Sequence, residues 1–293
     1  MIFSPEGLTS SAGFRKALTV IFLALVLLSA GCVNDDTGTA SSPFYTTRPV
    51  GTANSQPLYV FAVCGDNRTM GIESGVLPGI IESAKENGAR FMVDTGDVSG
   101  NGSRDELMLY KNLVDESGLE FHTVPGNHDV GSGGVSQEYE EIIGPYYFSF
   151  DYAGDHFIII DNADDRTGID DRQMQWLSED LATNNGMAHQ FVFAHIPMAD
   201  ASLPSEHVSG EKGGEGLRSG RQLVELAVDS PNVEAFFFGH IHAYLAYQLD
   251  GIDAYVTGGA GAPLYFPESA GGYYHYLLVS VYPDDVVVEV VRV

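Results

Sequence analysis

The chain alternates short, continuous apolar runs with longer segments in which apolar residues recur every three or four positions. Continuous apolar runs are typical of strands buried on both faces, and the longer spacing predicts amphipathic helices. The predicted strands are Tyr59–Cys64, Arg90–Val93, Glu120–Val124, Phe157–Ile160, Gln190–Ala194 and Val233–Phe238. The predicted helices are Ile72–Asn87, Arg104–Glu116, Asp171–Thr183 and Arg221–Val228. Strands that alternate with helices in this way predict an α/β domain with buried sheets.

Two of the predicted helix starts have the spacing of a capping box. In this motif a serine and a glutamate or glutamine three residues later satisfy each other's backbone N–H groups. The pairs are Ser103 with Glu106 and Ser219 with Gln222. We therefore expect helices to begin at these two serines.

The last part of the chain has strand-like segments with little helix between them. These segments are Tyr244–Leu249, Ala254–Thr257, Tyr274–Val281 and Val286–Val291. Consecutive strands without a crossover helix favour antiparallel pairing. The whole pattern therefore predicts a pair of mixed sheets with helices on their outer faces.

The N-terminal segment has the pattern of a secretory signal. Arg15 and Lys16 precede an apolar run over residues 17–30, and small residues stand directly before Cys32. The run is too short for a comfortable membrane-spanning helix. We expect a lipoprotein-like signal peptide over residues 1–31, with Cys32 as the first mature residue and the site of lipid attachment.

The predicted tether and domain follow this signal. Residues 32–57 are rich in Thr, Ser, Gly and Asn and indicate a flexible tether, and residues 58–293 form the predicted domain. Ser29 stands where lipoprotein processing sites usually have a large aliphatic residue, so an uncleaved signal anchor stays open as an alternative. Either form of attachment predicts an extracytoplasmic, membrane-anchored protein.

The charge balance narrows the classes of partner. The chain has 40 Asp and Glu against 14 Lys and Arg, a formal net charge of −26. A negative electrostatic field repels nucleic acid, so we expect no nucleic-acid partner.

The cysteine content excludes a disulfide framework. The only cysteines are Cys32 and Cys64. Hydrophobic residues make up 44% of the chain, which is enough for a core that stabilises the fold instead.

Polar residues stand at the ends of five of the predicted strands. The five clusters are Cys64-Gly65-Asp66-Asn67-Arg68, Thr95-Gly96-Asp97, Gly126-Asn127-His128-Asp129, Ala194-His195 and Gly239-His240-Ile241-His242. Ligands of α/β sheets bind beyond the carboxyl ends of the strands, so the clusters are expected to converge on one crevice. Carboxylate, amide oxygen and imidazole ligands together suit Mn, Fe or Zn.

Such a ligand set fits the chemistry of phosphoester hydrolysis. Two metal ions about 3.5–4 Å apart lower the pKa of a bridging water and clamp the phosphoryl oxygens during displacement. A bridging ligand needs two oxygens to share, which makes Asp97 the natural bridge. The sequence therefore predicts an enzyme that hydrolyses a phosphomonoester or a phosphodiester.

The series GDNR, GDV, GNHD, a single histidine after a strand, and GHIH resembles the calcineurin-like metallophosphoesterase superfamily over about residues 58–247. The resemblance implies a four-layer α/β/β/α sandwich of two mixed sheets with a two-metal site. It implies that His128 contacts the phosphate or protonates the leaving group, with its ring oriented by Asp129. The implied ligands are Asp66 and His242 for the first metal, Asn127, His195 and His240 for the second, and Asp97 between them.

The chain departs from the superfamily at the first motif, where most members have Asp-x-His. Arg68 takes the place of that histidine, and an arginine cannot act as a metal ligand. The first metal is then expected to be held weakly or to be completed by Asn67 or Asn101. Arg68, as in the GDxR-type subgroup, is expected to donate to the substrate phosphate instead.

Two other functions stay open. A catalytically degenerate domain would bind metal or phosphate at the surface without turnover, and a metal-scavenging lipoprotein would carry exchangeable metal. Among the other histidines, His122, His189 and His275 are expected to pack outside the site. His207 lies in a stretch rich in Gly and Ser that could face the substrate or form an ordinary loop.

Overall fold

The structure is a computed structural model that describes residues 56–131, 134, 136–164, 166–200, 203, 207–209 and 214–293. The predicted signal peptide, Cys32 and the tether up to residue 55 lie outside the described residues. Within the described ranges, no helix is long and apolar enough to cross a membrane.

The first sheet has the strand order β11-β10-β1-β2-β3. Its strands are β1 Tyr59–Cys64, β2 Phe91–Asp94, β3 Glu120–Thr123, β10 His275–Tyr282 and β11 Asp285–Arg292. β1, β2 and β3 are parallel, whereas β10 pairs antiparallel with both β1 and β11. The sheet is therefore mixed.

The second sheet has the order β4-β5-β6-β7-β9-β8. Its strands are β4 Phe148–Tyr152, β5 Asp155–Ile159, β6 Gln190–Phe193, β7 Val233–Phe238, β8 Tyr244–Leu249 and β9 Ile252–Thr257. β5, β6, β7 and β9 are parallel, and β4 and β8 form antiparallel edges. The antiparallel pairing expected near the end of the chain is confirmed for β8–β9 and β10–β11. It does not extend to β9 and β7, because the β8–β9 hairpin returns the chain parallel to β7.

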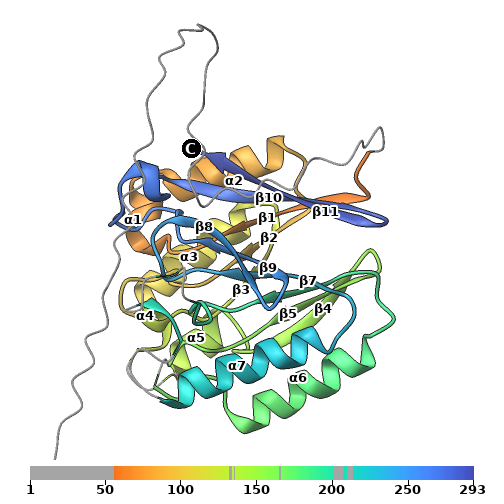
Figure 1. Ribbon diagram of the computed structural model, residues 1–293. Helices are drawn as coiled ribbons and strands as arrows, with labels where there is room; N and C mark the ends of the chain where they lie inside the picture. Colours follow the sequence, from red (N-terminus) through yellow and green to blue (C-terminus); the bar gives the residue numbers. More distant parts are fainter. Residues whose placement is uncertain are drawn as a thin grey trace, which may run out of the picture. The chain divides into compact units, whose positions relative to one another are not determined.

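Helices cover the outer faces of both sheets (Figure 1). The helices are α1 Arg68–Glu73, α2 Val76–Glu86, α3 Arg104–Ser117, α4 Asn127–Val130, α5 Gln137–Ile142, α6 Asp171–Thr183 and α7 Gly214–Val228, with a short 3-10 turn, η2, at Glu268–Ala270. Apolar residues of α2 and α3 pack on the first sheet, and those of α6 and α7 pack on the second. Between the sheets lies a third apolar cluster rich in phenylalanine, which includes Phe61, Phe157 and Phe237. The predicted four-layer α/β/β/α sandwich of two mixed sheets is confirmed.

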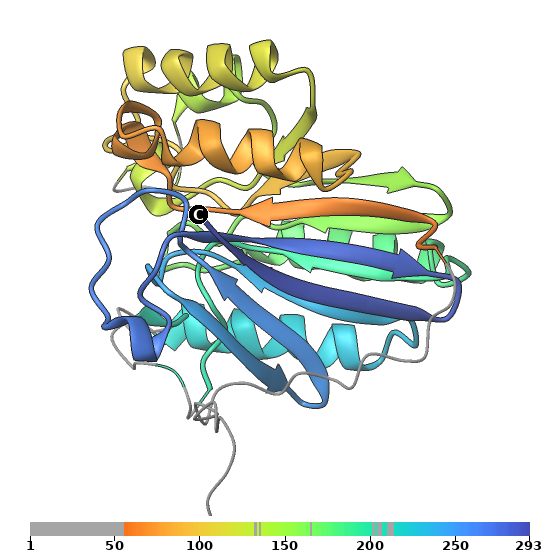
Figure 2. The same cartoon turned by 90° about the horizontal axis from the view of Figure 1, so that it is seen from above.

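The polar loops gather at one end of the two sheets. Figure 2 shows the carboxyl end of β1 and the long loop that follows β9 at this same end. β1, β2 and β3 are parallel in the first sheet and β6, β7 and β9 in the second, so within each sheet the loops after these strands leave from one edge. Hydrogen bonds between the loops, such as His240 N to Asp66 Oδ2 at 2.8 Å, bring the two edges together.

Three details of the helix prediction were wrong. The helix expected over Ile72–Asn87 is divided at Gly75, which adopts a left-handed conformation with φ of 82°. The Ser103 side chain makes no cap hydrogen bond; the Glu106 carboxylate accepts from Asn101 N and Thr69 Oγ1, each at 3.0 Å. The last of these helices begins at Gly214, so Ser219 lies inside it.

A histidine between two carboxylates connects the second sheet to α6. His156 of β5 has its Nδ1 2.7 Å from Asp151 Oδ1 of β4 and its Nε2 2.7 Å from Asp180 Oδ2 of α6. Burial lowers the pKa of His156, but the hydrogen bonds and charges of the two carboxylates outweigh it, and the net pKa is raised. The charged imidazolium therefore stabilises the folded state.

We predict that His156→Gln lowers the free energy of unfolding by about 2 kcal/mol at pH 5, the size of a charged hydrogen bond. Since the folded pKa lies above the unfolded value of about 6.5, this stabilisation is complete below that pH and is lost as pH rises through the folded pKa. Urea denaturation of wild type and variant over a pH series measures the difference.

His122→Gln is the matched control for this prediction. Burial lowers the pKa of His122, so its contribution to stability must change with pH in the opposite direction. A cost of His156→Gln that stays constant with pH would contradict the prediction.

Candidate metal centre

Three of the predicted ligands lie two or three residues after the end of a strand and have a left-handed backbone conformation. Asp66, Asp97 and His240 have φ of 59°, 57° and 67°. Their loops approach closely: a Cβ on Gly96 would lie 2.8 Å from Gly126 N and 2.9 Å from His195 Nδ1. Only glycine fits there, which explains the glycine that precedes Asp97.

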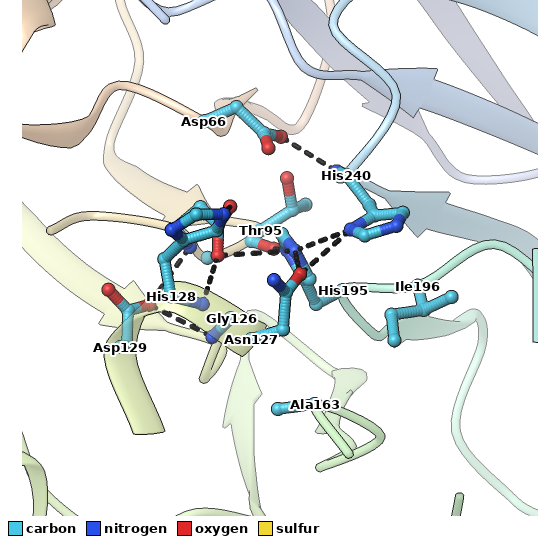
Figure 3. A network of polar contacts seen from close by, with 12 residues as sticks. Asp66, Thr95, Gly126, Asn127, His128, Asp129, Ala163, His195, Ile196 and His240 are labelled. Atoms are coloured by element: carbon cyan, nitrogen blue, oxygen red, sulfur yellow. Dashed lines mark hydrogen bonds and ion pairs between the residues drawn. The ribbon is translucent and has the colours of Figure 1, made fainter. Parts of the chain in front are cut away.

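The ligand atoms predicted for the second metal lie within hydrogen-bond distance of one another. Asn127 Oδ1 is 3.1 Å from His195 Nε2 and 2.8 Å from His240 Nδ1, and the two ring nitrogens are 3.3 Å apart. Asp97 Oδ1 is 3.4 Å from His195 Nε2. Figure 3 shows the side chains of Asn127, His195 and His240 pointing toward one point from three separate segments.

Backbone carbonyls set the orientation of two of these imidazoles. His195 Nδ1 is 2.8 Å from Thr95 O, and His242 Nδ1 is 2.6 Å from Pro263 O. A carbonyl oxygen can only accept, so each Nδ1 carries a proton and each Nε2 is the ring nitrogen that faces the centre and can bind a metal. Burial and the neighbouring His195 lower the pKa of His240, which keeps that ring neutral. Neutral imidazole is the form that binds a metal.

The pair predicted for the first metal is fully buried. Asp66 Oδ2 accepts from His240 N at 2.8 Å, while Asp66 Oδ1 lies 3.4 Å from His242 Nε2 and has no hydrogen-bond partner among the described residues. Burial raises the pKa of Asp66, but the electrostatic interaction with His242 beside it and with the neighbouring His195 and His240 outweighs this effect and holds the pKa at about 2. An ionised, buried oxygen without a donor is what a cation would satisfy.

Arg68 lies against the carboxylate predicted to bridge the two metals. Its Nη2 is 3.2 Å from Asp97 Oδ2, and its Nε is buried without a hydrogen-bond partner among the described residues. The guanidinium therefore has a free donor beside the centre. Its side chain is 16% exposed.

The role expected for Asp129 was wrong in one respect. The His128 ring is oriented by the carbonyl of Gly100, which lies 2.9 Å from Nδ1, and not by Asp129. Asp129 accepts instead from the backbone of Asp97, Ser99 and Gly126 at 2.8–2.9 Å (Figure 3). It therefore positions the loop that carries Asp97. The His128 side chain is 36% exposed, and its Nε2 lies 3.9 Å from Asp97 Oδ2, beside the centre.

The two asparagines considered for the first metal differ. Asn101 is exposed, and its Oδ1 accepts from Ser103 N at 3.0 Å, so that oxygen is already used. Asn67 is fully buried, its Nδ2 donates to Asp94 Oδ2 at 2.8 Å, and its Oδ1 has no hydrogen-bond partner among the described residues.

Two positioning residues were missed from the sequence. Asp94, at the end of β2, accepts from Asn67 Nδ2 at 2.8 Å and from Gly96 N at 3.1 Å. It therefore connects the loop after β1 to the loop after β2. Asn162 Oδ1 accepts from the backbone of His195 and Ile196, each at 3.0 Å. Both follow the pattern of the other clusters, since each stands at or just beyond the carboxyl end of a strand.

The remaining histidines have separate surroundings. His207, whose role was left open, has its ring centroid 5.8 Å from that of His240, at the edge of the centre. His122 stacks on Phe150, and His189 contacts Glu234 and the Tyr282 carbonyl. His275 is buried at the start of β10.

The donor chemistry fits a metal. Ligand atoms of Asp66, Asp97 and His195 all lie within 4.8 Å of one another and all three residues are buried. Together with the orphaned Asp66 Oδ1 and the lone pairs of the imidazoles, they form a set suited to one or more divalent cations.

Similar proteins have related descriptions. A Fibrobacter succinogenes protein named as a probable cyclic nucleotide phosphodiesterase is 25% identical over 173 residues, 57% of this chain and 63% of that protein. An Arcobacter nitrofigilis protein named as a probable glycerophosphodiester phosphodiesterase is 25% identical over 166 residues, 52% of this chain and 56% of that protein. The chain thus spans about three fifths of the length of these curated relatives.

Solved structures share the fold. A dimetal phosphatase from Danio rerio superimposes with a TM-score of 0.62 at 14% identity, over 80% of this chain and 96% of that chain. A Plasmodium protein described as the anchor in the inner membrane complex gives 0.56 at 16%, over 80% and 84%.

The family comparison covers most of the domain. The family model for calcineurin-like phosphoesterases matches residues 59–244, which include every cluster described above. The chain therefore belongs to the calcineurin-like phosphoesterase family, a family of phosphoric ester hydrolases.

Proposed function

We propose that the protein is a metal-dependent hydrolase of a phosphomonoester or phosphodiester, with two metal positions. The observation that carries the proposal is the contact of Asn127 Oδ1, His195 Nε2 and His240 Nδ1 within 3.3 Å of one another, at the ends of separate strands. Such a group of lone pairs is costly to bury unless it binds a cation. Family membership supports the same chemistry.

The roles proposed for the residues follow from their positions. Asn127, His195 and His240 would hold one metal, Asp66 and His242 would hold the other, and Asp97 would be shared between them; Mn, Fe and Zn suit these donors. When bound, the metals supply an activated water and positive charge for the phosphoryl oxygens. His128, whose ring is held by the Gly100 carbonyl and whose side chain is 36% exposed, contacts the phosphate or delivers a proton to the leaving group.

Arg68 supplies positive charge to the substrate. Its free Nε and the nearby Nη2 can donate to one phosphoryl oxygen or to two. A cation in this place matters because the chain carries a net charge of −26 and repels anions at long range. The names of the relatives favour a diester as the first substrate to test.

Turnover of the purified full chain with an aryl phosphate and an aryl diester, in Mn²⁺ or Zn²⁺, tests the proposal. Asp97→Asn is expected to lower kcat/KM at least about 100-fold, since even groups that only orient a metal ligand contribute 10- to 100-fold. Asp284→Asn, in an exposed turn, is the matched control and should keep full activity. Metal binding without turnover above Asp97→Asn would favour the degenerate alternative.

The metal position of Asp66 and His242 is expected to bind more weakly than the other, so it should be filled by the second equivalent of metal. Arg68 places a positive charge 3.2 Å from Asp97 Oδ2 and adds no ligand. We predict that Arg68→His, which removes the charge and adds an imidazole, tightens binding of the second equivalent of Mn²⁺ about tenfold. Calorimetric titration of metal-free protein measures both equivalents.

Arg68→Ala separates the effect of losing the positive charge from the effect of gaining an imidazole ligand, because it removes the charge without adding a ligand. It is expected to tighten the second equivalent less than Arg68→His. The same affinity in wild type and both variants would show that Arg68 does not weaken the first position.

We also propose that the protein is extracytoplasmic and anchored to a membrane. The support is the sequence alone: Arg15 and Lys16, the apolar run over residues 17–30, and Cys32. Cys32→Ala is expected to remove a covalent lipid, seen by mass spectrometry of the mature chain. An unmodified Cys32 with residues 1–31 retained would favour the uncleaved anchor.

A further inference from the structure

One exposed aromatic side chain stands next to the centre. Among the described residues with exposed large apolar side chains, Tyr265 is the one aromatic, and it is 64% exposed. Its ring stacks on His242 with centroids 4.8 Å apart and an interplanar angle of 18°. One face of the tyrosine thus lies on a predicted ligand, and much of the rest is open to solvent.

The loop that carries Tyr265 is fixed to the centre. It follows β9, and Ala260 N donates to Gly65 O at 3.0 Å while Ala262 N donates to Asp66 O at 2.8 Å. Pro263 O accepts from His242 Nδ1 at 2.6 Å. Three hydrogen bonds therefore connect this loop to the segments of Asp66 and His242, and Tyr265 comes two residues after the last of them.

The hydrogen bonds of its loop distinguish Tyr265 from an ordinary exposed side chain. Isolated apolar residues at a surface need no explanation. Tyr265, however, is held on a loop that is hydrogen-bonded to the centre, and its ring stacks on the imidazole whose Nε2 faces Asp66 Oδ1. The ring is therefore one side chain away from the atoms that would bind metal and phosphate.

We infer that Tyr265 is a specificity-determining residue that stacks on an aromatic ring, aryl or nucleobase, in the ester group of the substrate. The inference rests on the proposed phosphoesterase function and names its substrate class. Stacked aromatic pairs contribute beyond the area they bury, and every such ring has a face that can use this contact. An uncharged ring also avoids the repulsion that a chain of net charge −26 exerts on polyanionic groups.

A structural role for Tyr265 gives a different expectation. His242 is only 2% exposed, and the tyrosine ring covers one of its faces. If Tyr265 served only to shield His242 from water, its loss would weaken metal binding and would affect all substrates equally. The experiment must therefore measure ligand preference and metal content together.

Two phosphonates that differ only in one group provide the probe. Phenylphosphonate and methylphosphonate carry the same head group and are not hydrolysed as esters, so their dissociation constants report binding without chemistry. Calorimetry on the Mn²⁺-loaded full chain is expected to show about tenfold tighter binding of phenylphosphonate, equivalent to about 1.4 kcal/mol.

Tyr265→Leu and Tyr265→Phe are the matched variants. The leucine variant keeps an apolar side chain without a ring, and it is expected to lose the preference for phenylphosphonate while its methylphosphonate affinity and Mn²⁺ content stay unchanged. The phenylalanine variant keeps the ring and is expected to keep the preference.

Three results would overturn the inference in distinguishable ways. Equal binding of both phosphonates by wild type would remove the aromatic preference and leave the proposed function intact. Lower Mn²⁺ content with equal weakening of both phosphonates in Tyr265→Leu would assign the shielding role. Failure of the Mn²⁺-loaded wild type to bind either phosphonate, together with no turnover of any phosphoester, would overturn the proposed function as well.

Discussion

The centre depends on one buried carboxylate that fastens two loops. Asp129 accepts from the backbone N–H groups of Asp97, Ser99 and Gly126, and so holds the loops that follow β2 and β3 in one arrangement. Burial and the charge of Asp97 raise the pKa of Asp129 to about 7, whereas these donors favour its ionised form. A cation bound by Asp97 would cancel the opposing charge. Metal binding and the order of these loops therefore support each other.

Asp66, Asp97 and His240, whose backbones are left-handed, lie in loops that are hydrogen-bonded to one another. A left-handed conformation at a residue other than glycine costs about 1–3 kcal/mol. Asp66 N donates to Gly96 O at 2.8 Å, and His240 N donates to Asp66 Oδ2 at 2.8 Å, so each strained loop is hydrogen-bonded to another. The loops of β1, β2 and β7 are thus parts of one unit. A change in any of them is expected to reach the others through the backbone.

The sequence predicted the strands better than the details of the loops. Runs such as Tyr59–Cys64 and Val233–Phe238 are buried on both faces and have the same bounds in the structure, because continuous burial leaves a continuous apolar run. The antiparallel edge strand Phe148–Tyr152 was missed because half-buried residues leave a weaker pattern. The clusters at strand ends could be predicted to meet, since topology alone brings them together. Their side-chain partners could not: the spacing of Asp129 beside His128 does not reveal that its carboxylate turns to the Asp97 loop.

Arg68 shows why a motif position has a backbone role as well as a side-chain role. The backbone N–H of Arg68 donates to Asp97 O at 2.9 Å, and this bond does not depend on the side chain. The loop after β1 therefore keeps its connection to the loop after β2. Its guanidinium contacts the Asp97 carboxylate, with Nη2 3.2 Å from Oδ2. A histidine there would add a ligand, whereas arginine adds a permanent charge. The arginine therefore preserves the backbone connection between the loops and places a permanent positive charge beside Asp97. In a chain with a net charge of −26, an anionic ligand at this centre would depend on such local positive charge.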